Sequence, residues 1–237
     1  MKSTAGLFKL CDDLCTMGLT EAYYEFFIGL SANNNKTWFD AHRGEYEKEV
    51  KARFHDFVES VLAKVSAVDA RFSSLIPKDC IFRINKDVRF ARDKSPYKLH
   101  CSAAIQIGGR KEMSAGGMYI EFGPELCAIY SGVYMPERDE LQKIRERIAG
   151  DLEGFERVIS DRDFVAFFGG VMGHKNKRLD PNLMLAAKSQ PLIFNKQFYV
   201  RHLMEAEDTL AENFDDYVVK VWQASESYNR FIAGHNE

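Results

Sequence analysis

The sequence lacks the short motifs that usually identify an enzyme class. It contains no G-x-x-x-x-G-K-[ST] phosphate loop and no G-x-G-x-x-G dinucleotide fingerprint. It has no G-x-S-x-G elbow and no Ser/His/Asp order, which argues against the common serine hydrolases. None of its six histidines pairs with another at metal-ligand spacing. We therefore expect no metal and no cofactor.

Cysteine is sparse, with five residues scattered along 237 positions. An odd and scattered set argues against a disulfide framework. Cys11 and Cys15 are close in sequence, but no second close Cys or His pair completes a metal site. We interpret the cysteines as reduced, mostly buried side chains of a cytosolic protein.

Long hydrophobic runs and a strong net charge are also absent. No apolar run approaches the roughly 20 residues of a membrane span. Charged residues interrupt the first apolar residues, so we expect no secretory signal and a soluble protein of the cytoplasm. The net charge of -3 provides no overall field for nucleic acid, so any attraction to a polyanion has to be local.

The apolar pattern predicts helices at both ends of the chain. Tyr23, Phe26 and Leu30 form a helical stripe after a capping residue, Thr20. Further stripes predict a long helix over roughly 36–66, several helices after Pro136, one of them capped by Asp161, and a final helix over roughly 203–223. No linker divides these segments. We expect a variable extension over 1–19 and a single domain over 20–237.

The middle of the chain alternates with period 2. The predicted strands are IFRIN, CSAAIQI, GMYIEF and LCAIYSGV, each with one apolar face. This order predicts an α+β fold, in which an antiparallel sheet of about four or more strands, roughly 80–134, is covered on one face by N- and C-terminal helices. The other face would carry polar residues, among them Tyr119 and Tyr130.

A charged stretch, FRINKDVRFARDKSPYK over 82–98, is the strongest functional signal. Its cations and anions sit among regularly spaced apolar residues, which is unusual for a solvated run or for a core strand. If the chain stays extended, Arg83, Asp87 and Arg89 share the polar face. Two arginines two residues apart on one face of a strand lie about 7 Å apart, close enough to grip one phosphate or carboxylate.

We therefore predict an anion site on the polar face. The predicted ligand-binding residues are Arg83, Asp87, Arg89, Asp93, Lys94, Lys98, Tyr119, Tyr130 and Arg178. The expected partner is an anionic small molecule. Three alternatives stay open: a solvated face laced with ion pairs, a contact surface for protein or nucleic acid, and a network that only fixes the fold. Whether the protein is an enzyme is also open; Asp87 and His100 are the first candidates for a general base.

These residues carry a family resemblance over roughly 20–232. The stretch RINKDVRFARDKSPYK, the segment NNNKTWFDAHRGEY over 33–46, the segment GVYMPE, and Lys177 with Arg178 all match the pattern of the family catalogued only as domain of unknown function 2461. The chain resembles this family, which implies an α+β domain and no particular activity. It departs from the family after Arg178, where LDPNLMLAAKS replaces an acidic, His-containing turn, so any catalytic groups on that turn are lost here.

Overall fold

The computed structural model describes residues 17–89, 92–111 and 117–234. Cys11, Cys15 and most of the predicted extension over 1–19 lie outside this part of the chain, as does Phe90 within the charged stretch.

The centre of the fold is a four-stranded antiparallel sheet in the order β1-β2-β3-β4. The strands are β1 (Cys101–Ile105), β2 (Met118–Gly123), β3 (Leu126–Val133) and β4 (Phe198–Met204). Alternate residues such as Ile105, Ile120 and Ile129 are fully buried on one face, as the period-2 pattern predicts. The α+β class is confirmed.

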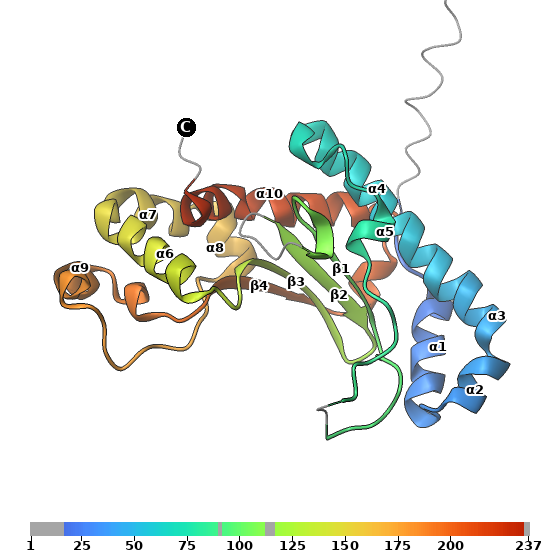
Figure 1. Cartoon of the computed structure of the whole chain (residues 1–237). Coiled ribbons are helices and arrows are strands. Elements are labelled where there is room, and N and C mark those ends of the chain that lie inside the picture. The colour runs from blue at the N-terminus through green and yellow to red at the C-terminus, as the bar shows by residue number, and fades with distance from the viewer. Residues whose placement is uncertain (1–16, 90–91, 112–116, 235–237) are drawn as a thin grey trace, which may run out of the picture.

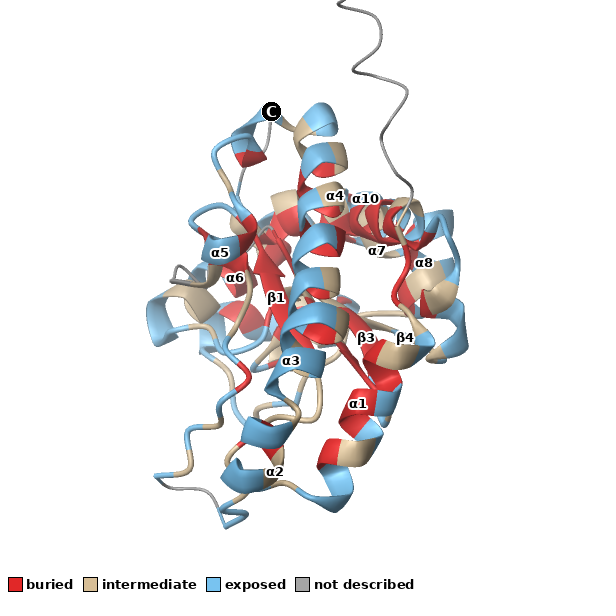
Figure 2. Ribbon diagram, turned by 90° about the vertical axis from the view of Figure 1, so that its right-hand side faces the viewer, coloured by how far each residue is buried: buried red, intermediate tan, exposed pale blue. Residues whose placement is uncertain are grey.

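Helices cover that apolar face from both ends of the sequence (Figure 1). The N-terminal helices are α1 (Glu21–Ala32), α2 (Lys36–Ala41), α3 (Arg43–Glu45), α4 (Arg53–Val68) and α5 (Pro77–Cys80), with a π-helical turn over Tyr46–Ala52 between α3 and α4. The C-terminal helices are α6 (Arg138–Gly150), α7 (Leu152–Ile159), α8 (Arg162–Phe168), α9 (Met184–Ser189) and α10 (Phe214–Ala233). Figure 2 shows the buried residues concentrated between α4, α10 and the sheet.

The predicted caps are confirmed. The Thr20 hydroxyl accepts a hydrogen bond from the Tyr23 amide at 3.3 Å, and Asp161 accepts from the first amides of α8. The predicted long helix over 36–66 is interrupted at His42, which follows the last residue of α2. At the start of α2, Asn35 caps the helix by accepting a hydrogen bond from the Trp38 amide at 3.0 Å. These caps satisfy amides that a helix start leaves unpaired.

Two element predictions were wrong. Residues 81–85 form no regular strand: Ile81 bridges Ala103 and Asn85 bridges Tyr97, each as an isolated pair. The fourth strand is instead β4, in a segment where we predicted no strand and whose last two residues we assigned to the start of the final helix. Phe198 and Val200 are buried with period 2, and the helix begins only at Phe214.

A buried ion pair joins α4 to α10. Asp215 has no exposed surface, and its carboxylate accepts hydrogen bonds from Ser60 and, at 2.8 Å, from Lys64. Lys64 also contacts Asp216 at 2.6 Å, on the solvent side. Burial alone would raise the pKa of Asp215, but the donors from Lys64 and Ser60 outweigh it and hold that pKa below its ordinary value.

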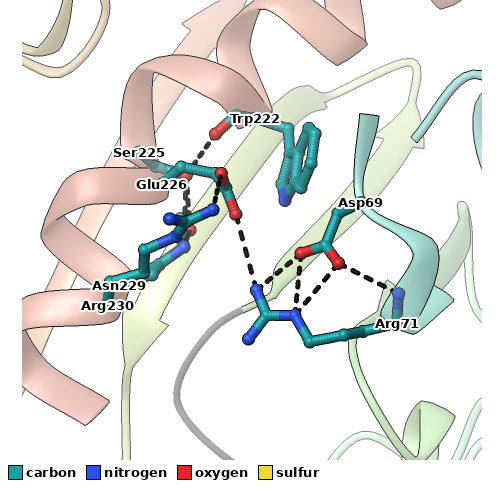
Figure 3. Close-up of polar contacts among 8 residues, drawn as sticks. Asp69, Arg71, Trp222, Ser225, Glu226, Asn229 and Arg230 are labelled. Carbon is teal, nitrogen blue, oxygen red and sulfur yellow. Dashed lines mark hydrogen bonds and ion pairs between the residues drawn. The ribbon is translucent and has the colours of Figure 1, made fainter. Parts of the chain in front are cut away.

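A second polar cluster ties the turn after α4 to α10 (Figure 3). Arg71 pairs with Asp69 at 2.5 Å and reaches Glu226 at 3.9 Å, while Arg230 donates to Glu226 at 3.0 Å. Trp222 packs beside this cluster against Phe72. The two clusters fix α4 over the sheet. None of the helices in the described part of the chain is long and apolar enough to cross a membrane.

Candidate ligand-binding site

The second face of the sheet has no helix laid across it in the described part of the chain (Figure 1). Strand register places Ala104, Tyr119, Tyr130 and Arg201 in one row across the four strands. Every second residue along each strand points to this face. The prediction that Tyr119 and Tyr130 lie together on the face opposite the core therefore matches the register.

A cavity of about 570 Å³ opens over this row. Its lining includes Gln106, Gly132, Tyr134, Met135 and Tyr199, besides the row residues and Glu121. The volume falls within the range of roughly 300–1,000 Å³ typical of small-molecule sites. Met135 is 79% exposed and lies at the rim.

Four phenol rings form the walls of the cavity. Tyr119 and Tyr130 have ring centroids 5.9 Å apart, and Tyr134 and Tyr199 form an edge-to-face pair at 5.2 Å. Burial raises the pKa of both Tyr119 and Tyr130, because the phenolate loses its hydration. These two side chains therefore stay neutral hydroxyls at pH 7, able to donate a hydrogen bond.

Arg201 supplies the positive charge of the cavity wall. It stands opposite Tyr130 in the β3–β4 register, and its charge and hydrogen bond oppose the burial that raises the pKa of that tyrosine. Within the described residues no carboxylate lies within ion-pair distance of Arg201. A guanidinium presents a planar set of N–H donors that matches a carboxylate or phosphate.

Glu121 lies one step along β2 from Tyr119 and carries the negative charge of the wall. Tyr119 donates to it at 2.9 Å, and His100 Nδ1 lies 3.6 Å from its other oxygen. Burial lowers the pKa of His100, while Glu121 partly opposes that shift. Burial likewise lowers the pKa of Lys98, whose ammonium lies 5.3 Å from the centre of the Phe82 ring. Three titratable groups thus meet beside the cavity.

Most of the charged stretch lies in a loop whose charges pair locally. Arg89 pairs with Asp87 at 2.6 Å, and both side chains are largely exposed. Lys86 pairs with Asp93 at 2.6 Å, and its hydrogen bond holds the pKa of Asp93 well below its ordinary range. Lys94 donates to the Val88 carbonyl at 2.9 Å. Because the chain is not a strand here, the alternation that placed Asp87 and Arg89 on the sheet face does not hold.

The loop is fastened to the Asn-rich turn. The Asn34 amide donates to the Tyr97 carbonyl at 3.0 Å and accepts from the Tyr97 amide at 3.2 Å. Tyr97 also stacks on Phe39, with ring centroids 4.1 Å apart. Asn34 therefore takes the place of a paired strand, which explains a conspicuous asparagine without invoking a ligand.

The remaining predicted site residues are spread out. Arg83 is exposed, and it is close enough to Lys98 to contribute to the lowered pKa of that lysine. Arg178 is exposed in the segment between α8 and α9, outside the lining of the cavity. Of the predicted set, Tyr119 and Tyr130 line the cavity, Lys98 and His100 lie near Glu121 without lining it, and the other residues lie elsewhere.

The sequence reasoning missed Arg201, Tyr199 and Tyr134. A signal was present: FYVRHLM alternates, with Tyr199 and Arg201 opposite Phe198 and Val200. Assigning part of that segment to a helix concealed it.

Among the described residues, no cluster of metal-binding side chains lies at the cavity. His55, Asp56 and Glu59 are close enough to share an ion, but all three are exposed on α4. Exposed acidic groups of this kind are common without a metal.

The sequence was compared with known proteins. The sequence model of one family, described as "Conserved hypothetical protein (DUF2461)", matches residues 22–231. No curated protein matches the chain.

Proposed function

The chain belongs to the DUF2461 family, whose description names no activity, and from its cavity we propose that it binds an anionic small molecule on the open face of the sheet. Arg201 anchors the anion and the Tyr130 hydroxyl donates to it, while Tyr119 lines the cavity and donates to Glu121. Lys98 and His100 lie near Glu121, and their positive charge, when they are protonated, offsets the negative charge of that carboxylate. The proposal concerns binding, and it assigns no reaction.

One observation carries this proposal: an arginine without a carboxylate partner among the described residues faces a cavity walled by neutral phenols. A guanidinium in such a place has hydrogen bonds to offer, and partly desolvated surroundings strengthen its attraction for an anion. A purely solvated sheet face would lack an enclosed volume.

The contacts of the charged loop favour a structural role for its outer part. Asp87, Arg89, Asp93 and Lys94 are satisfied within the loop. Exposed pairs of this kind contribute little binding or stability. We therefore move the centre of the proposed site from these residues to Arg201, and retain Lys98, Tyr119 and Tyr130 from the original set.

The location is proposed to be the cytoplasm. The described cysteines, Cys80, Cys101 and Cys127, are all buried free thiols, as a reducing compartment allows.

The test is a thermal-shift screen with nucleotides, sugar phosphates and organic acids at low ionic strength. A ligand that binds the folded state raises the melting temperature, by an amount set by its concentration relative to its Kd. The screen is run on the wild type, on Arg201→Gln, and on Arg162→Gln as a matched control. Arg162 is an exposed arginine on α8, outside the cavity.

We expect at least one anion to raise the melting temperature of the wild type and of Arg162→Gln but not of Arg201→Gln. Equal shifts in all three proteins would place binding elsewhere. No shift with any compound at millimolar concentration would contradict the proposal.

A further inference from the structure

The charges on the cavity wall limit the ligand that can enter. Among the described residues that line the cavity, Arg201 is the single cation and Glu121 the single anion. A di- or triphosphate would bring several negative charges to one guanidinium and one carboxylate. Proteins that bind such groups supply several cations or a metal ion. The wall therefore suits one negative charge.

The side chains around Arg201 indicate which chemical group carries that negative charge. The guanidinium fork matches a planar carboxylate through two parallel hydrogen bonds. Tyr130 stands directly opposite Arg201 in the register, and Tyr119 is its neighbour on β2. The neutral Tyr130 hydroxyl supplies a donor to a remaining lone pair of the carboxylate, whereas the single proton of Tyr119 is already donated to Glu121.

The rest of the cavity is aromatic and apolar. Tyr134 and Tyr199 face each other as a T-shaped pair, and Met135 covers the rim. The floor between the two tyrosine pairs is bare at Gly132, which has no side chain and lies between Tyr130 and Tyr134 along the chain. A flat ring placed there would contact phenol faces and edges, the arrangement that aromatic groups favour.

The order of these groups along the strands sets the ligand's orientation. Gly132 pairs with Tyr199, the next outward-facing pair on this face is Tyr130 with Arg201, and Glu121 lies one further step along β2. Each step is about 7 Å. A carboxylate at Arg201 thus points its ring toward Tyr134 and Tyr199. A second negative group on the other side of Arg201, away from the ring, would meet Glu121.

From this arrangement we propose that the ligand is an aromatic monocarboxylate, an acid of one or two rings bound through Arg201 and Tyr130 with its ring between the tyrosine pairs. The inference rests on the proposed function and names the ligand class of the same site.

The test is isothermal titration of the full chain at pH 7 and low salt with three groups of probes. The first comprises benzoate, phenylacetate, indole-3-acetate and 2-naphthoate. The second comprises the uncharged amides of the same acids, and the third inorganic pyrophosphate and citrate. The proteins are the wild type, Arg201→Gln, Tyr134→Ala, and Arg162→Gln as control, each checked for native circular dichroism.

We expect at least one aromatic acid to bind with one-to-one stoichiometry. Its amide should bind at least about tenfold more weakly, and so should the acid to Arg201→Gln, because a charge-assisted pair is lost. Tyr134→Ala should weaken the two-ring acids more than benzoate, since it removes the wall beyond the first ring.

The outcomes separate the two proposals. If pyrophosphate or citrate binds through Arg201 and no aromatic acid does, the aromatic class is wrong and anion binding stands. If acid and amide bind equally, the carboxylate is not what is recognised. If none of the probes binds the wild type, the aromatic class is wrong, and the thermal-shift screen decides whether the cavity binds another anion.

Discussion

Replacing Asp215 should destabilise the protein far more than replacing its neighbour Asp216, although both contact Lys64. Asp215 is fully buried and also accepts from Ser60, whereas the Asp216 side chain is 44% exposed. The two substitutions share a residue type, a helix and a partner. They differ in whether water can replace the lost carboxylate.

The magnitude follows from the contacts. Removing one partner of a buried ion pair costs about 3–5 kcal/mol. Here Lys64 keeps Asp216 and is itself 14% exposed, so we place Asp215→Ala at about 2–4 kcal/mol of unfolding free energy. For a chain of this size, about 2–4 °C is lost per kcal/mol, so the melting temperature should fall by about 4–16 °C. Asp216→Ala should cost at most about 1 kcal/mol.

Urea denaturation and thermal melts of the two variants measure these differences. The pH dependence provides a second check with Asp215→Asn. The folded pKa of Asp215 is depressed, so the carboxylate adds stability above its unfolded pKa, near 4, and loses it as the pH falls through the folded value. The gap between wild type and Asp215→Asn should hold from pH 5 to 8 and shrink below about pH 4. Equal costs for Ala at 215 and 216 would refute the burial argument.

Three further predictions concern the loop and the cavity floor. Asn34→Ala should cost about 1–2 kcal/mol in urea unfolding, because both hydrogen bonds to the Tyr97 backbone are lost; a cost near zero would contradict the fastening role. Arg89→Ala should leave the melting temperature unchanged, since its ion pair is exposed, and a fall of several degrees would show that the loop charges support the fold. Gly132→Ala should cost at least about 2 kcal/mol, because φ is +93° and a Cβ would lie 2.3 Å from the Phe198 carbonyl oxygen; a wild-type urea midpoint would show that the strand relaxes easily.

Local sequence patterns predicted much of the fold. Alternation identified β1, β2 and β3, and helical stripes with capping residues located α1, α6 and α8. These features depend on neighbours within a few residues, so a single sequence carries them. The same period-2 alternation predicted that Tyr119 and Tyr130 lie on the face of the sheet opposite the core.

The rest depended on contacts that are distant in sequence. IFRIN alternates like a strand, but it makes only isolated bridges, Ile81 with Ala103 and Asn85 with Tyr97, so the segment remains a loop. The charged residues of that loop form ion pairs with one another. The charge-rich sequence therefore identified a loop with internal ion pairs, and it did not identify the residues that line the cavity. Arg201 joins the site only because β4 pairs with β3 across about 70 residues of intervening chain, and no local pattern predicts that pairing.

The most direct test of the central claim is an NMR titration of protein labelled in its tyrosine rings. Benzoate and inorganic pyrophosphate are added in separate titrations to the wild type and to Arg201→Gln. Tyr23 and Tyr228 are fully buried and act as internal controls. We predict that at least one of the anions shifts the signals of Tyr119 and Tyr130 saturably, leaves the controls in place, and has no effect in Arg201→Gln. Saturable shifts that persist in Arg201→Gln, or no shifts at Tyr119 and Tyr130 with either anion, would contradict an anion site on the open face of the sheet.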